Sequence, residues 1–319
     1  MNFLRLFSVL LTLTALLPAT EPVGRRDLRI HDPSTIVQAD GTWWIFGTGR
    51  LLNAARSTDL QHWKKLPSPL SAPPAWAGDA APDNKSNYYW APDIIHRGNL
   101  YYLYYSVSEF GKNNSAIGLA TSPTLNPQTS GYAWTDRGIV IRSVKGDHFN
   151  AIDPSILADT DGHLWMAFGS FWNGLFIVEL NPATGLRIAP ESPMHQVARD
   201  TEIEAATLYK KDGYYYLFFD RGLCCRGVKS TYRIVVGRSR AVTGPYLDDQ
   251  GRDLNDGGGR AFLGATGDFI GPGHAGLLRD AAGVEWVSVH FYDGSNHGAP
   301  TLALRRVGWT EDGWPRVID

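Results

Sequence analysis

The chain has 319 residues, a formal net charge of −2 at pH 7 and 43% hydrophobic residues. This length allows one large domain or two small ones, and the composition is that of a globular protein, which excludes a disordered chain. A net charge so close to zero gives no electrostatic reason to expect nucleic acid or an anionic membrane as a partner.

The N-terminal segment has the pattern of a secretion signal. Arg5 precedes an uncharged and mostly apolar run, Leu6–Leu17, and small and turn residues follow at Pro18–Thr20. The run is shorter than the about 20 residues that span a bilayer. We therefore predict a cleaved signal peptide over residues 1–20 and a secreted or periplasmic protein. An uncleaved anchor stays open, because Leu17 stands where a small residue is preferred.

A tight glycine turn followed by aromatic and β-branched residues occurs five times along the chain. The turn glycines, which permit a positive φ, are Gly41, Gly98, Gly162, Gly213 and Gly283. A short apolar strand precedes each turn, at 35–37, 94–96, 155–158, 206–209 and 275–278, and a third strand follows, for example at 233–239 and 301–307. These repeats predict an all-β, five-bladed β-propeller. It forms one domain over residues 21–319, because a single blade does not bury both of its faces.

Four of the five repeats carry an ionisable residue at a matched distance before the turn glycine. These residues are Asp32, Asp153, Glu204 and His274, whereas the second repeat has Ala91 at this place and Asp93 two positions later. The first strands of all blades run in the same direction along the axis, so we expect these residues to meet at one mouth. A single Asp-Pro is also explained by local backbone hydrogen bonding, but a matched set is less easily explained in this way.

Carboxylates clustered at such a mouth shift one another's pKa values apart, so that one stays an ionised base while another stays a protonated acid. Glycoside hydrolysis uses such a pair. We predict Trp90, Phe171 and Trp172 as aromatic substrate contacts, with simple packing as the equal alternative. Asp93 and Arg226 are predicted as polar substrate contacts.

The only two cysteines, Cys224 and Cys225, are adjacent in the chain. They cannot join distant segments, and two thiols are too few for a structural zinc site. Two small residues at a strand edge or in a turn are the simpler interpretation, and a vicinal disulfide is the alternative.

Several motifs resemble those of glycoside hydrolase family 43. His31–Pro33, Trp90–Asp93, Ala151–Ser155 and Glu202–Ala205 resemble its blade-start motifs, and Cys224–Tyr232 is similar to a stretch in its endo-1,5-α-L-arabinanases. One departure is Ala206, which stands where many relatives have proline.

The resemblance implies roles for the matched residues. Asp32 would be the general base, Glu204 the general acid, and Asp153 the carboxylate that raises the pKa of the acid and orients it. His274 would face a central ion, usually Ca²⁺, held largely through water; the alternative is a hydrogen-bonded channel residue without metal.

The residues and the resemblance together predict an inverting hydrolase that cleaves internal α-1,5 bonds of arabinan, a side chain of pectin. An exo-acting α-L-arabinofuranosidase or β-xylosidase on the same fold stays open, as does closure of one end of the cleft by the segment 68–87. A non-catalytic carbohydrate-binding propeller is the alternative from another class, and the matched carboxylates argue against it. We expect a monomer, because a closed propeller needs no partner.

Overall fold

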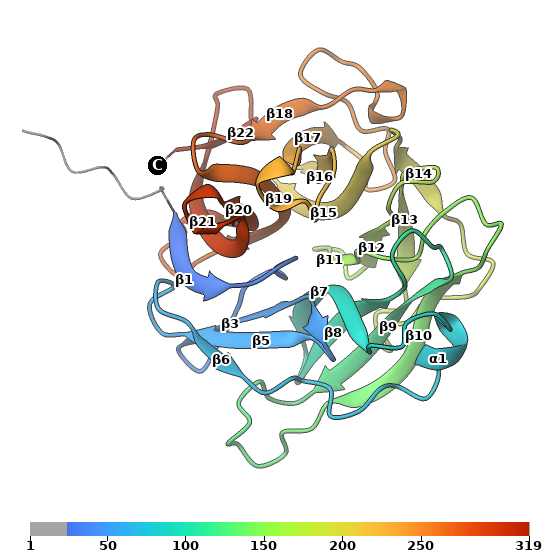
Figure 1. The fold of residues 1–319 in the computed structure, drawn as a ribbon. Helices are drawn as coiled ribbons and strands as arrows, with labels where there is room; N and C mark the ends of the chain where they lie inside the picture. Colours follow the sequence, from blue (N-terminus) through green and yellow to red (C-terminus); the bar gives the residue numbers. More distant parts are fainter. Residues whose placement is uncertain (1–23, 319) are drawn as a thin grey trace, which may run out of the picture.

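The computed structural model describes residues 24–318, so the predicted signal peptide over residues 1–20 lies outside the described residues. Five antiparallel sheets surround a central axis (Figure 1). The predicted all-β, five-bladed β-propeller is therefore confirmed. Within residues 24–318, no helix has both the length and the apolar character that crossing a membrane requires.

Each blade is a sheet of four main strands. Blade 1 contains β2 (Val37–Ala39), β3 (Thr42–Gly47), β5 (Asn53–Ser57) and β6 (Lys64–Leu66). Blade 2 contains β7 (Tyr88–Arg97), β8 (Leu100–Val107), β9 (Ser115–Ser122) and β10 (Thr135–Ser143), with β4 (Gly49–Arg50) beside β7. Blade 3 contains β11 (Ser155–Ala158), β12 (Leu164–Phe168), β13 (Leu175–Leu180) and β14 (His195–Ala198).

Blade 4 contains β15 (Ile203–Lys211), β16 (Tyr214–Arg221), β17 (Arg233–Ser239) and β18 (Arg260–Leu263). Blade 5 contains β19 (Phe269–Arg279), β20 (Glu285–Asp293), β21 (Ala299–Trp309) and β1 (Arg25–Arg29), and β22 (Pro315–Val317) also pairs with β21. The helical segments are short: α1 (Ala77–Ala80), η1 (Gly227–Lys229), η2 (Leu254–Asp256) and η3 (Gly294–Asn296).

The five glycine turns lie where the repeats predict them, between the first and second strands of each blade. Two predicted strands, 155–158 and 233–239, coincide with β11 and β17, and four others lie inside longer strands. The predicted strand 35–37 overlaps β2 only at Val37. Turn chemistry therefore locates the hairpins more accurately than it locates the strand ends.

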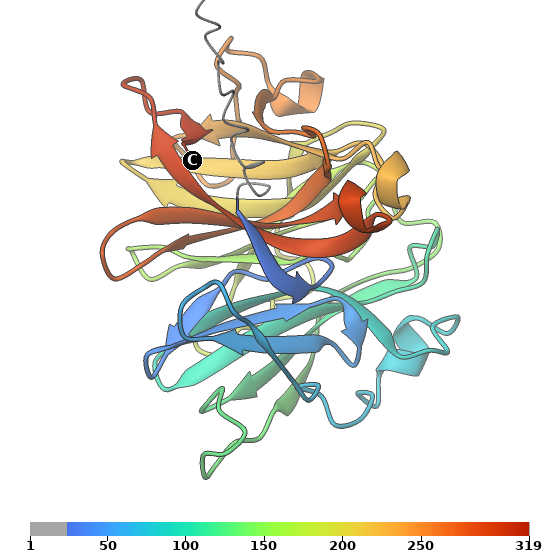
Figure 2. The same cartoon turned by 60° about the vertical axis from the view of Figure 1, so that its left-hand side comes forward.

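Strand β1 closes the ring by completing the last blade. It comes from the start of the described chain and pairs antiparallel with β21, with Arg29 opposite Thr301. In Figure 2 the blue β1 lies against the red strands of blade 5. The ion pair Arg25–Asp293, with 3.2 Å between nitrogen and oxygen, adds to this contact. Strands from both ends of the described part of the chain therefore form blade 5.

Apolar side chains fill the spaces between adjacent blades. One cluster joins blades 2 and 3 through fully buried residues such as Tyr104, Leu119, Met166 and Phe168. Four further clusters occupy the other interfaces. Burying a large apolar side chain contributes about 1.5–3 kcal/mol, so these interfaces supply most of the stabilisation and fix the positions of the inner strands.

One residue at the start of each blade has a left-handed backbone. These residues are Asp32 (φ 46°), Ala91 (φ 45°), Asp153 (φ 59°), Ala205 (φ 55°) and His274 (φ 57°). A left-handed conformation of a residue other than glycine costs about 1–3 kcal/mol and persists only where surrounding contacts hold it.

Hydrogen bonds from the neighbouring blade hold these five residues. Each backbone N–H donates to a side chain of the preceding blade: Ala91 to Thr48 Oγ1 (2.9 Å), Asp153 to Ser106 Oγ (2.9 Å), Ala205 to Asp153 Oδ2 (3.1 Å), His274 to Asp220 Oδ2 (2.8 Å) and Asp32 to His290 Nδ1 (3.2 Å). The five bonds form a closed ring around the axis, which we call the amide ring.

The amide ring corrects one sequence alignment. Counting back from the turn glycine matches Glu204 to Asp32 and Asp153, but the left-handed residue of blade 4 is Ala205. Glu204 is therefore equivalent to His31, one residue earlier.

Asp93 also joins blades. Its Oδ1 accepts a hydrogen bond from the Thr35 N–H of blade 1 (3.1 Å), and its Oδ2 accepts one from the Ile156 N–H of blade 3 (2.8 Å). The side chain is buried, with 5% exposure of the residue. These contacts give Asp93 a structural role, and its predicted contact with substrate stays a prediction.

We predict that Asp93→Ala destabilises the fold by about 2–4 kcal/mol, because two buried N–H groups lose their acceptors. Thermal unfolding followed by circular dichroism would show a midpoint several degrees lower. Asp93→Asn keeps one acceptor oxygen and should show a smaller decrease. An unchanged midpoint in the alanine variant would contradict the structural role.

Candidate active site

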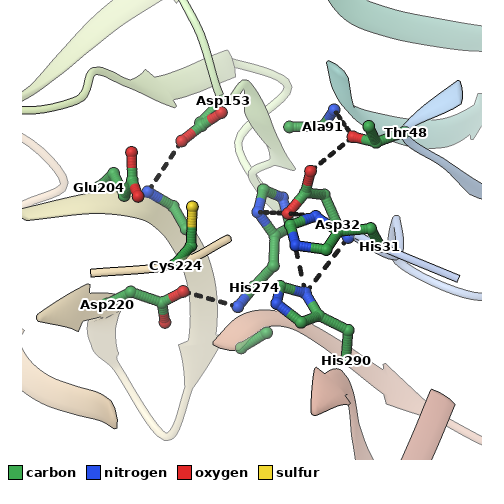
Figure 3. Close-up of polar contacts among 12 residues, drawn as sticks. His31, Asp32, Thr48, Ala91, Asp153, Glu204, Asp220, Cys224, His274 and His290 are labelled. Carbon is green, nitrogen blue, oxygen red and sulfur yellow. Dashed lines mark hydrogen bonds and ion pairs between the residues drawn. The ribbon is translucent and has the colours of Figure 1, made fainter. Parts of the chain in front are cut away.

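Carboxyl and imidazole groups from four blades face one another at one end of the axis (Figure 3). Asp32 precedes β2, Asp153 precedes β11, Glu204 lies on β15 and His274 lies on β19. The structure therefore brings the four predicted ionisable residues together. Asp32 and His274 lie on one side of the mouth, and Asp153 and Glu204 lie on the other.

Imidazole rings surround the carboxylate of Asp32. His31 Nδ1 lies 2.8 Å from Asp32 Oδ1, and the Nδ1 atoms of His274 and His290 each lie 3.7 Å from the same oxygen. Thr48 Oγ1 donates a hydrogen bond to Oδ2 at 2.5 Å. Burial raises the pKa of Asp32, but the imidazoles, His31 foremost, outweigh burial and hold the pKa far below its usual range. This environment favours the ionised form of Asp32.

His290 and Tyr292 also belong to the site, and they were not identified from the sequence. His290 Nδ1 accepts the N–H of Asp32, so this nitrogen carries no proton, and burial holds the pKa of His290 well below its usual value. His31 stacks on His290 with 4.0 Å between ring centroids, and its Nε2 lies 2.8 Å from the Tyr292 hydroxyl. These contacts fix the imidazole that lies against Asp32.

The carboxyl group of Glu204 has two hydroxyl partners. Ser170 Oγ donates to Oε2 at 2.7 Å, and the Tyr232 hydroxyl donates to Oε1. Burial raises the pKa of Glu204, whereas these two hydrogen bonds lower it by stabilising the carboxylate, and the net pKa lies above the usual value. The pKa values of Glu204 and Asp32 are therefore moved in opposite directions.

Asp153 lies beside the backbone that carries Glu204. Its Oδ2 accepts the N–H of Ala205 at 3.1 Å. Burial and then the charge of Glu204 raise the pKa of Asp153 well above its usual value. Because two neighbouring carboxyl groups resist ionising together, the pair Asp153–Glu204 retains a proton more readily than either group alone.

A further buried carboxyl group, Asp220, lies behind Glu204. Asp220 is fully buried at the end of β16, directly opposite Glu204 in the sheet, and burial raises its pKa well above the usual value. Gly273 makes room for it, since a Cβ there would lie 2.5 Å from Asp220 Oδ2 and 2.4 Å from a ring carbon of Tyr232. In the sequence, Asp220 is marked only as an acidic residue at the end of the apolar run Tyr216–Phe219.

Cys224 and Cys225 form a disulfide, so the alternative interpretation of these residues holds. They lie in the loop between β16 and β17, and Figure 3 shows the Cys224 sulfur between Glu204 and Asp32. The N–H of Cys225 donates to the Tyr292 hydroxyl at 2.7 Å. The disulfide therefore borders the mouth and is linked through Tyr292 to His31.

The other predicted substrate contacts lie on the same end of the propeller. Trp90 is half-buried directly before Ala91, and Phe171 is half-buried after β12. Arg226 is exposed at the start of η1, next to the disulfide. Trp172 is exposed and faces a separate groove. Sugar contacts of these four residues stay predictions.

The surroundings of His274 give few ligands for calcium. His274 is buried and lines a space of about 10 Å³ on the axis, which holds about one water molecule. Ca²⁺ takes six to eight oxygen ligands in proteins, and both oxygens of the nearby Asp93 already accept backbone N–H groups. The described residues near His274 thus form no cage of protein oxygens, so water would have to supply the ligands.

Comparison with known proteins places the chain in a family. The sequence profile described as "Glycosyl hydrolases family 43" matches residues 19–315. An extracellular exo-α-(1→5)-L-arabinofuranosidase of Cellvibrio japonicus is 40% identical, over 96% of this chain and 91% of that protein. An extracellular endo-α-(1→5)-L-arabinanase of Bacillus subtilis is 38% identical, over 92% of this chain and 88% of that protein.

Solved structures agree with the sequence comparison. The α-L-arabinanase of Cellvibrio cellulosa complexed with arabinohexaose superposes with a TM-score of 0.86 at 40% identity, covering 91% of this chain and 96% of that one. The endo-arabinanase of Bacillus licheniformis gives a TM-score of 0.84 at 40% identity, covering 92% and 99%. The chain described here belongs to glycoside hydrolase family 43 and is a glycoside hydrolase.

Proposed function

We propose that this chain hydrolyses internal α-1,5-L-arabinofuranosidic bonds of arabinan with inversion at the anomeric carbon. The observation that carries the proposal is the pair Asp32 and Glu204, which lie across the mouth with pKa values moved in opposite directions. The similarity to the Cellvibrio exo-α-(1→5)-L-arabinofuranosidase and the Bacillus endo-α-(1→5)-L-arabinanase supports the choice of substrate.

In the proposed reaction Asp32 is the general base. Its carboxylate accepts a proton from a water molecule, and the oxygen of that water attacks the anomeric carbon from the face opposite the leaving group. The imidazole of His31 and the hydroxyl of Thr48 fix both oxygens of the carboxylate, so little reorganisation precedes proton transfer.

Glu204 is the general acid of this reaction and donates its proton to the departing glycosidic oxygen. Ser170 and Tyr232 orient its carboxyl group, and Asp153 fixes the backbone next to it through the Ala205 N–H. As a neighbouring carboxyl group, Asp153 also disfavours ionisation of Glu204, in the same direction as the burial that raises the pKa of Glu204.

Endo cleavage needs a cleft that is open at both ends. The segment 68–87, a candidate for closing one end, packs along blade 2: Arg142 forms an ion pair with Asp79 at 2.7 Å, and the Trp76 indole N–H donates to Asp136. Helix α1 of this segment lies at the outer edge of blade 2 (Figure 1). This placement favours endo cleavage, although the Cellvibrio japonicus relative is named as an exo-acting enzyme.

Secretion as a monomer completes the proposal. Two relatives carry the word extracellular in their names. The predicted N-terminal signal is consistent with export, and a disulfide is typical of proteins that function outside the reducing cytosol.

We predict that Glu204→Ala lowers the rate of hydrolysis of debranched arabinan by at least about a hundredfold, the usual contribution of a general acid. Product sizes followed over time test the cleavage mode. The wild-type enzyme should release mixed oligosaccharides early, whereas early release of arabinose alone would favour an exo-enzyme. If the wild-type protein bound sugar but hydrolysed neither arabinan, xylan nor aryl glycosides, the non-catalytic carbohydrate-binding propeller would be the better interpretation.

The hydrogen bond from Tyr232 generates a prediction about pH. Activity needs Asp32 ionised and Glu204 protonated, so the alkaline limb of kcat/KM follows the pKa of Glu204. Tyr232 lowers that pKa, and Tyr232→Phe should therefore move the alkaline limb to higher pH. Tyr246→Phe is the matched control, since this buried hydroxyl donates to the Val242 carbonyl away from the site. A shift to lower pH, or an equal shift in the control, would contradict the assignment.

Calcium is proposed as an ion held at His274 through water, and no step above depends on it. Because a ligand that binds the folded state raises its stability, added Ca²⁺ should raise the thermal midpoint of the chelator-treated protein. The increase should be absent in His274→Ala. An equal increase in both proteins would place the ion elsewhere.

A further inference from the structure

A groove of about 580 Å³ lies beside the catalytic mouth, between blades 3 and 4. Three segments line it: 172–173 after β12, 199–201 before β15, and 255–257 around η2. Its volume falls in the range of about 300–1,000 Å³ that is usual for ligand pockets. None of the catalytic groups described above lines this groove.

The groove adjoins the site through the main chain. Asp200 and Thr201 line it only a few residues before Glu204 on β15. The Phe171 N–H donates to the carbonyl of Ile203 at 2.7 Å, which joins the loop carrying Trp172 to the strand carrying Glu204. A chain molecule bound at the mouth therefore meets the groove on leaving it between blades 3 and 4.

Trp172 forms one wall and is 41% exposed, which is unusual for so large an apolar side chain. Its backbone and that of Phe171 are both left-handed, with φ of 35° and 47°. Each such residue costs about 1–3 kcal/mol, and strain of this kind gathers at functional sites. Gly174 allows the tight loop, since a Cβ there would lie 2.2 Å from the Ala198 carbonyl oxygen.

Hydrogen bonds hold this strained loop in one conformation. The Asn173 N–H donates to the His148 carbonyl at 3.0 Å, and the Gly174 N–H donates to the Phe171 carbonyl at 2.6 Å. The loop therefore presents Trp172 at a fixed place in the open. Packing does not explain this position, because a large part of the side chain stays in solvent.

The opposite wall is polar and carries charges of both signs. Asp200 is fixed by Arg221, with 2.9 Å between Oδ2 and Nε, and Arg199, Thr201, Asn255 and Asp256 add donors and acceptors. Arg221 neutralises Asp200, and Arg199 offsets Asp256, so the groove has no net positive charge that would select an anionic ligand such as a polyuronate. An aromatic face together with polar groups of balanced charge suits a neutral sugar, whose ring offers an apolar face and a rim of hydroxyls.

We propose that this groove is a distal subsite that binds a neutral stretch of the polysaccharide substrate, away from the bond that is cleaved, with a sugar ring stacked on Trp172. The inference rests on the proposed function. It assigns Trp172 to the binding of long chains and not to the catalytic mouth. A long substrate therefore contacts both the mouth and the groove, whereas a short one contacts the mouth alone.

The test compares two substrates, debranched arabinan and arabinotriose, by the ratio of their kcat/KM values. Trp172→Ala should lower the polymer-to-trisaccharide ratio by about fivefold to tenfold, which is the loss of one aromatic stacking contact. Trp172→Phe keeps an aromatic face and should retain most of the ratio. Ile188→Ala is the matched control: it removes a similarly exposed apolar side chain, 49% exposed, from the turn between β13 and β14.

Direct binding gives a second measurement. In the Glu204→Ala background, calorimetry should show tighter binding of arabinohexaose than of arabinotriose, and Trp172→Ala should remove most of that difference. A ratio and a length dependence that do not respond to Trp172→Ala would overturn the subsite while leaving arabinan hydrolysis intact. If the wild-type enzyme hydrolysed neither substrate, the proposed function would fall, and the subsite with it.

Discussion

The amide ring is the constraint on which the rest of this structure depends. Five left-handed residues carry strain of about 1–3 kcal/mol each, and each is held by a hydrogen bond to the preceding blade. The apolar clusters between blades stabilise the propeller but do not direct any side chain at the axis. The amide ring does so, because a left-handed residue turns the chain sharply just before each inner strand.

The acceptors in the amide ring are also the groups that create the electrostatics of the site. His290 accepts the N–H of Asp32 and, as a neutral imidazole, lies near the Asp32 carboxylate. Asp153 accepts the N–H next to Glu204, and Asp220 accepts the N–H of His274. One set of bonds therefore joins the blades and also buries two carboxyl groups near the acid. Replacing one of these acceptors changes the stability of the fold and the pKa values of the site together. A pH profile therefore separates an effect on chemistry from an effect on folding better than a single rate does.

The sequence predicted the fold because its signals are local. Glycine turns before aromatic strands repeat five times, and Asp32, Asp153 and His274 keep the same spacing from them. The signals that failed are long-range. β1 pairs with β21 across almost the whole chain, and Ser170 and Tyr232 reach Glu204 from other loops. Asp220 was missed because one acidic residue after an apolar strand resembles an ordinary strand end.

The fivefold scaffold becomes an active site through differences between its equivalent positions. The left-handed position is Asp in blades 1 and 3, Ala in blades 2 and 4, and His in blade 5. Blade 4 breaks the pattern further, since its carboxyl group stands one residue earlier, at Glu204. Successive side chains of a strand point to opposite sides, so this shift gives Glu204 surroundings different from those of Asp32: two hydroxyls and a buried carboxyl group, where Asp32 has three imidazoles. An acid and a base with opposed pKa shifts thus arise from one repeated backbone, and a symmetric propeller with the same carboxylate at all five positions would lack that division.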